Sequence, residues 1–129
     1  MEETIFKTME LDNNQTLVIL DKSRKIAEDA YVVTMGVRMA IRVHRDLFAE
    51  NTVSDAQFDD IRKVLGDEFF YEYKSERNMI MAPEKNQVFE GLVATFITNM
   101  VPYISKSIFP EKKALKEYKE RVEKKNKDR

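Results

Sequence analysis

The 129-residue chain contains no cysteine and no tryptophan, a single histidine, and only three glycines and three prolines. Without cysteine it cannot form a disulfide, a thiolate metal site or a cysteine nucleophile, and this composition is typical of a reducing compartment. The glycines, Gly36, Gly66 and Gly91, lie too far apart to form a phosphate-binding loop. This spacing excludes the P-loop and the dinucleotide-binding fingerprint.

Long apolar runs are absent as well. The most apolar segment, 88–104, contains Glu90 and Asn99 and is shorter than the ~20 apolar residues needed to span a bilayer. The amino end begins Met1-Glu2-Glu3, with no basic region followed by an apolar run, so no secretory signal is expected. We therefore predict a cytoplasmic protein without a membrane partner.

Charge is balanced overall, with a net charge of −1, but it is unevenly distributed. Residues 111–129 contain nine basic and five acidic side chains, a composition typical of a solvated basic helix. Because acids are interspersed and Tyr118 is its one aromatic residue, nucleic-acid binding is not expected. We predict a single α+β domain over 1–110 and a charged C-terminal helix over 111–129 that can fray.

The clearest pattern is an alternation of apolar and other residues from Tyr31 to His44. A period of two with β-branched residues predicts a strand with one buried face. This strand is longer than usual, so we expect it to bend, with Gly36 as the place for a bulge or a close backbone approach. The apolar face carries Tyr31, Val33, Met35, Val37, Met39, Ile41 and Val43.

Shorter patterns predict the other strands. They are expected at 4–11, 15–21, 69–73 and 79–81, with turns at 12–14 and 75–78. The polar stretch 22–29 is expected to connect the second strand to the long one.

Two start signals predict helices. The segment Ser54-Asp55-Ala56-Gln57 fits a capping box, which begins a helix that ends near Gly66. Pro83 opens the longest predicted helix, near 83–106, in which apolar pairs recur four residues apart. Pro102 should kink or end that helix, and Pro110 should begin the last one.

Together these elements predict an α+β fold in which an antiparallel meander sheet of four to five strands packs against two or three helices. The sequence does not determine the strand order. Both an open sheet backed by helices and a partly closed barrel are compatible with it.

Signals for catalysis are weak. His44 has no nucleophile or carboxylate at a spacing typical of a catalytic or metal site. The acids Asp55 and Asp59 share a helix face, but acids near a helix N-terminus are explained by the helix dipole. We therefore predict no catalytic residue, no metal site and no cofactor, and we favour a protein that is not an enzyme.

Basic residues around the long strand form a candidate anion site. If the loop before the strand folds over its less apolar face, the positive side chains of both can converge on a phosphate or carboxylate. The alternative is that they line the solvated outer face of an antiparallel sheet. The candidate residues are Arg24, Lys25, Arg38, Arg42 and His44.

The segment Leu20-Asp21-Lys22-Ser23-Arg24, followed by Ala27 and Asp29, leads into the long strand. It resembles an uncharacterised family of bacterial proteins of unknown function. The resemblance covers about the first third of the chain, and it implies a bacterial protein without indicating an activity.

The apolar face of the long strand and the aromatic segment 69–73 present more apolar surface than the few predicted helices are expected to cover. We therefore predict a non-catalytic binding or assembly module that self-associates as a homodimer. The alternative is a small-anion or nucleotide sensor that uses the arginines of the sheet face.

Overall fold

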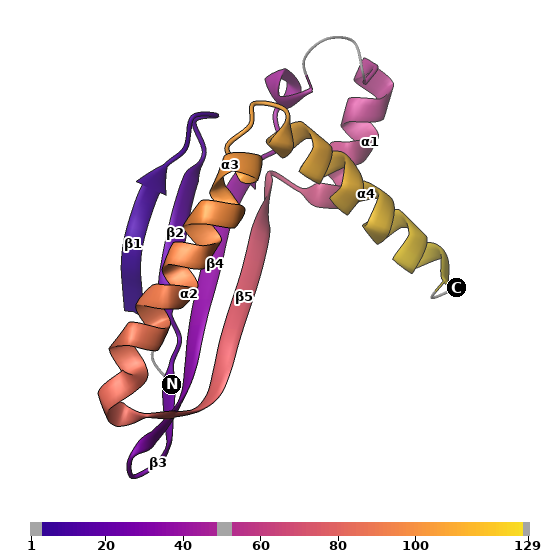
Figure 1. The fold of residues 1–129 in the computed structure, drawn as a ribbon. Coiled ribbons are helices and arrows are strands. Elements are labelled where there is room, and N and C mark those ends of the chain that lie inside the picture. The colour runs from indigo at the N-terminus through magenta and orange to yellow at the C-terminus, as the bar shows by residue number, and fades with distance from the viewer. Residues whose placement is uncertain (1–3, 49–52, 128–129) are drawn as a thin grey trace. The chain divides into compact units, whose positions relative to one another are not determined.

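A computed structural model describes residues 4–48 and 53–127. The described residues form an α+β fold with an antiparallel five-stranded sheet of order β1-β2-β4-β3, in which β5 also pairs with β4 (Figure 1). This confirms the predicted fold class. The strands are β1 (Thr4–Glu10), β2 (Thr16–Asp21), β3 (Arg24–Ala27), β4 (Ala30–Arg42) and β5 (Glu68–Met81). The α-helices are α1 (Asp55–Leu65), α2 (Lys85–Asn99), α3 (Val101–Ile104) and α4 (Phe109–Lys127), and short 3-10 helices lie at Arg45–Leu47 and Ala82–Glu84.

Backbone contacts divide the chain into two compact units, and strands β4 and β5 run through both. The first unit comprises Met1–Met39 and Tyr71–Lys106, and the second comprises Ala40–Phe70 and Ser107–Arg129. Within the second unit, α4 packs against α1.

In the first unit, α2 lies against one face of the sheet, which we call the helix face (Figure 1). The predicted apolar side chains of β4 from Val33 to Met39 are buried, as the alternation predicted. Aromatic contacts join α2 to strands on both sides of β4. The ring of Phe6 in β1 lies 4.9 Å from that of Phe89, and the ring of Tyr73 in β5 lies 5.2 Å from that of Phe96.

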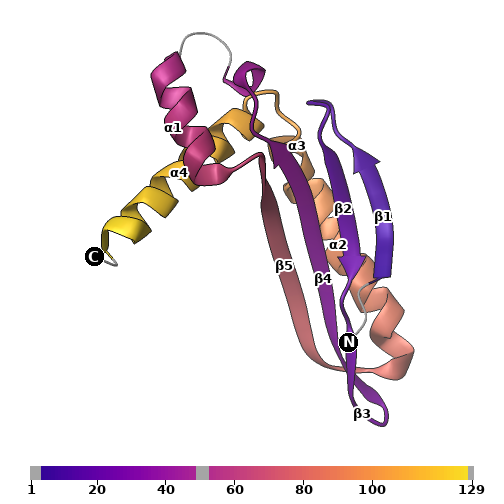
Figure 2. The same ribbon diagram turned by 180° about the vertical axis from the view of Figure 1, so that it is seen from behind.

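The helices of the first unit leave the other face of its sheet uncovered, and we call this the open face (Figure 2). Thr34 on this face is nevertheless buried, because neighbouring segments bond to it on both sides. Its backbone N–H donates to the Ser23 hydroxyl at 3.0 Å, and its own hydroxyl donates to the Glu76 carboxylate at 3.0 Å.

The segment 22–29 is not the simple connection that we predicted, because it contains β3, which pairs with the start of β4. The N–H of Lys22 donates to the carbonyl of Thr34, so β2 and β3 form one interrupted partner of β4. The Lys22 side chain crosses Gly36, where an added Cβ would lie 2.8 Å from the Lys22 Cε. A side chain, rather than backbone, therefore makes the close approach at Gly36.

Strand β5 is a single strand of 14 residues, so the predicted turn at 75–78 and the separate strand at 79–81 are wrong. Pairing with β4 explains this continuity, because side chains meet across the two strands at two points. Thr34 bonds to Glu76, and Arg38 Nε lies 3.9 Å from the Glu72 carboxylate. The polar residues that resembled a turn instead belong to the edge strand, where Ser75 is half-buried and residues 76–78 are exposed.

The turn between β1 and β2 is held to the end of α3. The Asn13 side-chain amide donates to the carbonyls of Ile104 and Lys106 at 2.8 and 3.0 Å. The bond to Ile104 satisfies a carbonyl group that the end of α3 leaves without a helical partner.

Helix α1, in the second unit, begins with the predicted capping box. The Ser54 hydroxyl accepts from the Gln57 N–H, the Gln57 side chain accepts from the Ser54 N–H, and Gly66 ends the helix with φ +81°. The longest helix is α4, with 19 residues, and not the one predicted near 83–106. In the segment 83–106, helix α2 ends at Asn99, because Pro102 cannot continue the helical hydrogen bonds. Helix α3 follows as a short separate helix.

Candidate functional site

The structure does not gather the predicted anion residues of the first unit. Arg24 lies opposite Val32 of β4, which places it roughly 20 Å from Arg38 along the strand at ~3.3 Å per residue. Lys25 lies opposite Tyr31, so its side chain leaves the strand on the opposite face from that of Arg24. The register of β3 therefore separates these three side chains.

The remaining predicted residues, Arg42 and His44, are exposed residues of the second unit. Arg45, next to His44, already binds neighbouring groups. Its guanidinium donates to the Asp55 carboxylate at 3.0 Å and to the Val53 carbonyl at 2.8 Å. This arrangement gives Arg45 a structural role at the start of α1.

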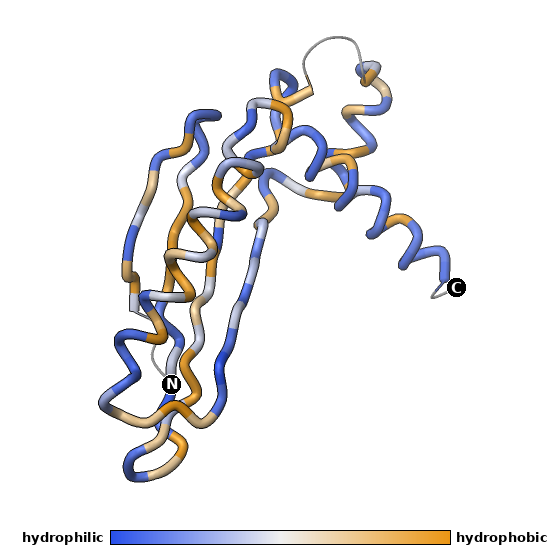
Figure 3. Tube along the Cα trace, in the orientation of Figure 1, coloured by the Kyte–Doolittle hydropathy of each residue, from blue (hydrophilic) through white to orange (hydrophobic). Residues whose placement is uncertain are grey.

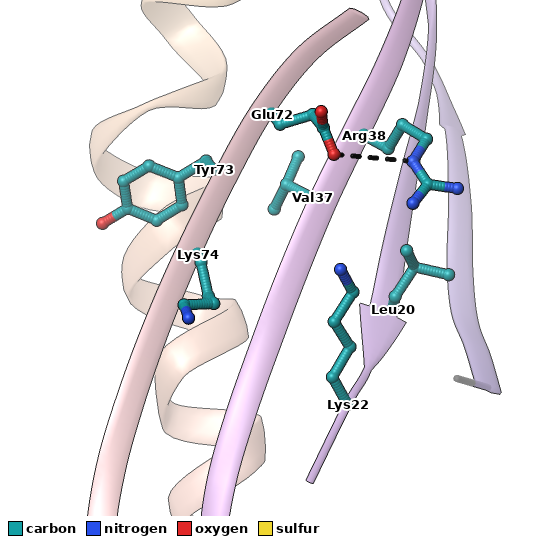
Figure 4. Close-up of a pocket in the computed structure, with 7 residues that line it drawn as sticks. All are labelled: Leu20, Lys22, Val37, Arg38, Glu72, Tyr73 and Lys74. Carbon is teal, nitrogen blue, oxygen red and sulfur yellow. Dashed lines mark ion pairs between the residues drawn. The ribbon is translucent and has the colours of Figure 1, made fainter. Parts of the chain in front are cut away.

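Arg38 lines a hollow of about 220 Å³ on the open face of the first unit (Figure 4). Lys22 from the end of β2 and Lys74 from β5 bring two further positive side chains to it. Glu72 provides one carboxylate, 3.9 Å from Arg38. The Glu76 carboxylate lies 4.0 Å from Lys74 Nζ, so three positive groups lie near two carboxylates. This excess of positive charge makes the hollow suited to a small anion. We call it the basic hollow.

Sequence reasoning missed Lys22 and Lys74 because both approach Arg38 from neighbouring strands. A signal for Lys22 did exist, since Gly36 lacks the Cβ that would block its side chain. Lys74 could not be placed while its segment was assigned next to a turn.

A second hollow, of about 210 Å³, lies on the helix face between β5 and α2. The side chains that β5 contributes to it are Tyr73, Ser75 and Arg77, and Phe96 and Asn99 belong to the α2 wall. Helix α2 therefore does not fill the space beside the middle of β5. We call it the helix-side hollow.

A groove of about 350 Å³ lies between α1 and α4 in the second unit. Its walls are mainly apolar, including Val53, Ile61 and Leu115, and the Tyr118 hydroxyl donates a hydrogen bond to the Asp60 carboxylate at its border. That hydrogen bond raises the pKa of the Tyr118 hydroxyl. Tyr118 and Asp60 bond to each other. We therefore interpret the groove as the packing boundary between α1 and α4, and not as a binding site.

The outer edge of β5 pairs with no other strand in the described part of the chain. The carbonyl of Asp67 accepts from the Val43 N–H, and backbone groups of successive residues point to alternate sides of a strand. Even-numbered residues of β5 up to Asn78 therefore direct their N–H and C=O groups outward. In agreement with this, the Glu76 carbonyl accepts from the Arg77 side chain at 2.9 Å rather than from β4. The alternation shifts after Asn78, because Met79 has a φ of +54° and the Ala82 N–H donates to the Asp29 carbonyl.

Strand β1, which forms the sheet edge beside β2, is protected. It has seven residues, half as many as β5, and an irregularity between Ile5 and Lys7 interrupts its pairing with β2. Short, bulged edges resist pairing with another chain. Both strands expose large apolar side chains, Ile5 and Phe6 in β1 and Tyr73 and Met79 in β5, so the length of its backbone edge is what distinguishes β5.

The described residues include no group of three or more histidine or acidic side chains that could hold a metal ion. None of the described helices is long and apolar enough to cross a membrane. Comparison with known proteins finds no matching family model, no matching curated protein and no matching solved structure.

Proposed function

We propose that the protein is a non-catalytic assembly module that self-associates through the outer edge of β5. The observation that carries this proposal is the length of that edge. From Glu68 to Asn78, every second residue of β5 leaves its N–H and C=O groups without a strand partner among the described residues. Such an edge is a ready template for strand addition, in which backbone hydrogen bonds supply affinity.

Charge on β5 is the main argument against an open edge, because natural sheets use charged side chains to prevent pairing. On β5, however, the charges of Glu72, Lys74 and Glu76 alternate in sign along the open face. Alternating charges repel a uniformly charged strand but complement an antiparallel strand with the same alternation. A second copy of the chain provides such a strand.

Static light scattering over a concentration series tests self-association. We expect the wild-type mass to rise toward that of a dimer as the concentration approaches about 100 µM, a range typical of a weak interface. The Lys74→Pro variant removes one outward N–H and leaves the bonds to β4 intact, so it should stay monomeric. Its circular dichroism and thermal midpoint should resemble those of Lys74→Ala, which keeps the N–H. A wild-type chain that stays monomeric at every concentration contradicts the proposal.

The basic hollow favours a second candidate function, the binding of a small anion such as a phosphate or nucleotide. Its specific support is the absence of a side chain at Gly36, which lets Lys22 lie across β4 beside Arg38 and Lys74. A guanidinium binds two phosphate oxygens at once, and a lysine ammonium binds phosphate as a point charge.

Titration calorimetry with inorganic phosphate and with ADP tests this candidate. We expect the Arg38→Ala variant to lose most of the binding, and Gly36→Ala to weaken it by displacing Lys22. Lys25→Ala is the matched control, since its side chain leaves the other face of the sheet. Equal heats for wild type and Arg38→Ala would show that the hollow is not an anion site.

A further inference from the structure

The register of the proposed dimer can be read from the side chains of β5, and this inference rests on the proposed self-association. We infer that two copies pair antiparallel about a two-fold axis at Ser75, so that Ser75 of one copy lies opposite the partner's Ser75. A two-fold axis perpendicular to the sheet places one residue opposite itself and keeps every side chain on its own face. Tyr73, Lys74 and Ser75 are the residues near the middle of β5 that can take this position.

Centring on Ser75 gives complementary pairs on both faces. On the open face, Lys74 lies opposite the partner's Glu76, and the two-fold axis repeats this pair. On the helix face, Tyr73 lies opposite the partner's Arg77, where a guanidinium can lie over an aromatic ring. Opposite charges directly across antiparallel strands stabilise their pairing.

Centring on Lys74 is unfavourable. It places Lys74 opposite the partner's Lys74, and Glu72 opposite the partner's Glu76. Like charges directly across a strand pair repel, and here they would do so at three neighbouring positions.

Centring on Tyr73 is intermediate. It pairs Glu72 with the partner's Lys74, but it places Glu76 opposite an aromatic side chain, the partner's Phe70. Both carboxylates already have partners in their own chain, Glu72 with Arg38 at 3.9 Å and Glu76 with Lys74 at 4.0 Å, so the aromatic residue opposite Glu76 is what disfavours this register. Of the three registers, the one at Ser75 matches charge and aromatic groups best.

The backbone and the packing beside it agree with this register. Lys74 and the partner's Glu76 both direct their N–H and C=O groups outward, so they form a hydrogen-bonded pair. Arg77 must then release the Glu76 carbonyl, which frees its guanidinium for the aromatic ring opposite. The helix-side hollow beside Tyr73, Ser75 and Arg77 leaves space for those side chains to rearrange.

Cysteine crosslinking tests the register, because the chain contains no cysteine and each substitution reports one position. Ser75 and its copy would form a non-hydrogen-bonded pair with Cα atoms about 4.5 Å apart, within the range of a disulfide. Under mild oxidation at a concentration where the wild type is dimeric, we expect Ser75→Cys to form a covalent dimer about tenfold faster than Tyr73→Cys or Lys74→Cys. Faster crosslinking of either control in a dimeric protein contradicts the register and leaves self-association standing.

A charge exchange gives an independent readout if a cysteine variant fails to fold. We expect Lys74→Glu to weaken dimerisation about tenfold by facing the partner's Glu76, and Lys74→Glu with Glu76→Lys to restore it. Restoration by Glu72→Lys instead would place the axis at Tyr73. If the wild-type chain is monomeric at every concentration, self-association itself is contradicted. The register variants test only which residues lie opposite each other in a chain that dimerises.

Discussion

Arg45 and His44 show how far a single residue can be interpreted from its neighbours in sequence. A histidine followed by an arginine is compatible with an anion site, which is why His44 was a candidate. In the structure the Arg45 guanidinium donates to Asp55 and Val53, and it lies 5.7 Å from the centre of the Phe58 ring. Those partners come from residues eight to thirteen positions later, so they depend on a chain reversal that the local sequence does not encode.

We expect Arg45→Ala to lower the free energy of unfolding by about 1–2 kcal/mol, because the loop before α1 loses its charged donor and the side chain is partly exposed. Arg45→Lys should lose most of the same stability, since one ammonium cannot reach the carboxylate and the carbonyl with the fork geometry of a guanidinium. Urea unfolding followed by circular dichroism measures both. His44→Ala is the surface control, and a similar loss in that variant would refute the structural role of Arg45.

At the scale of elements, the sequence predicted best where the signal is local. The capping box of α1 and the alternation of β4 both depend on neighbouring residues, and both are confirmed. Strand β5 was misread as two strands because its middle is polar, as Figure 3 shows in its hydrophilic colour. A polar segment becomes a strand when a long partner provides its hydrogen bonds, and the contact between Thr34 of β4 and Glu76 of β5 spans 42 residues of sequence.

Tyr71 gives β5 a pH dependence. Burial raises the pKa of its hydroxyl, and the charges of Tyr73 and Tyr103 raise it further when they ionise. Because the folded pKa lies above the unfolded value of about 10, the neutral phenol adds stability below that pH, and this stability is lost as the pH rises through the raised pKa.

We therefore expect the free energy of unfolding to fall more steeply above about pH 10 in the wild type than in Tyr71→Phe. Urea unfolding at several alkaline pH values measures the two slopes, and Tyr31→Phe controls for the loss of a phenol elsewhere. Identical slopes for wild type and Tyr71→Phe would contradict a raised pKa.

At the scale of the whole molecule, fold class could be predicted, whereas the two units and the candidate sites could not. The units depend on which helices pack together, and α1 and α4 are separated by more than forty residues. Of the five basic residues predicted as one site, Arg38 lines the basic hollow, because strand register brought Lys22 and Lys74 to it instead of Arg24 and Lys25. Register depends on pairing between distant segments, so hydrophobic pattern alone does not determine which charges meet.

The central claim is that two copies of the chain pair through β5. Amide hydrogen exchange at about 5 µM and about 500 µM, on either side of the dissociation constant of a weak dimer, tests it most directly. The N–H groups of Glu72, Lys74 and Glu76 point away from β4, so we predict that their exchange slows at the higher concentration while that of β1 does not change. Equal exchange of these three amides at both concentrations would contradict the claim.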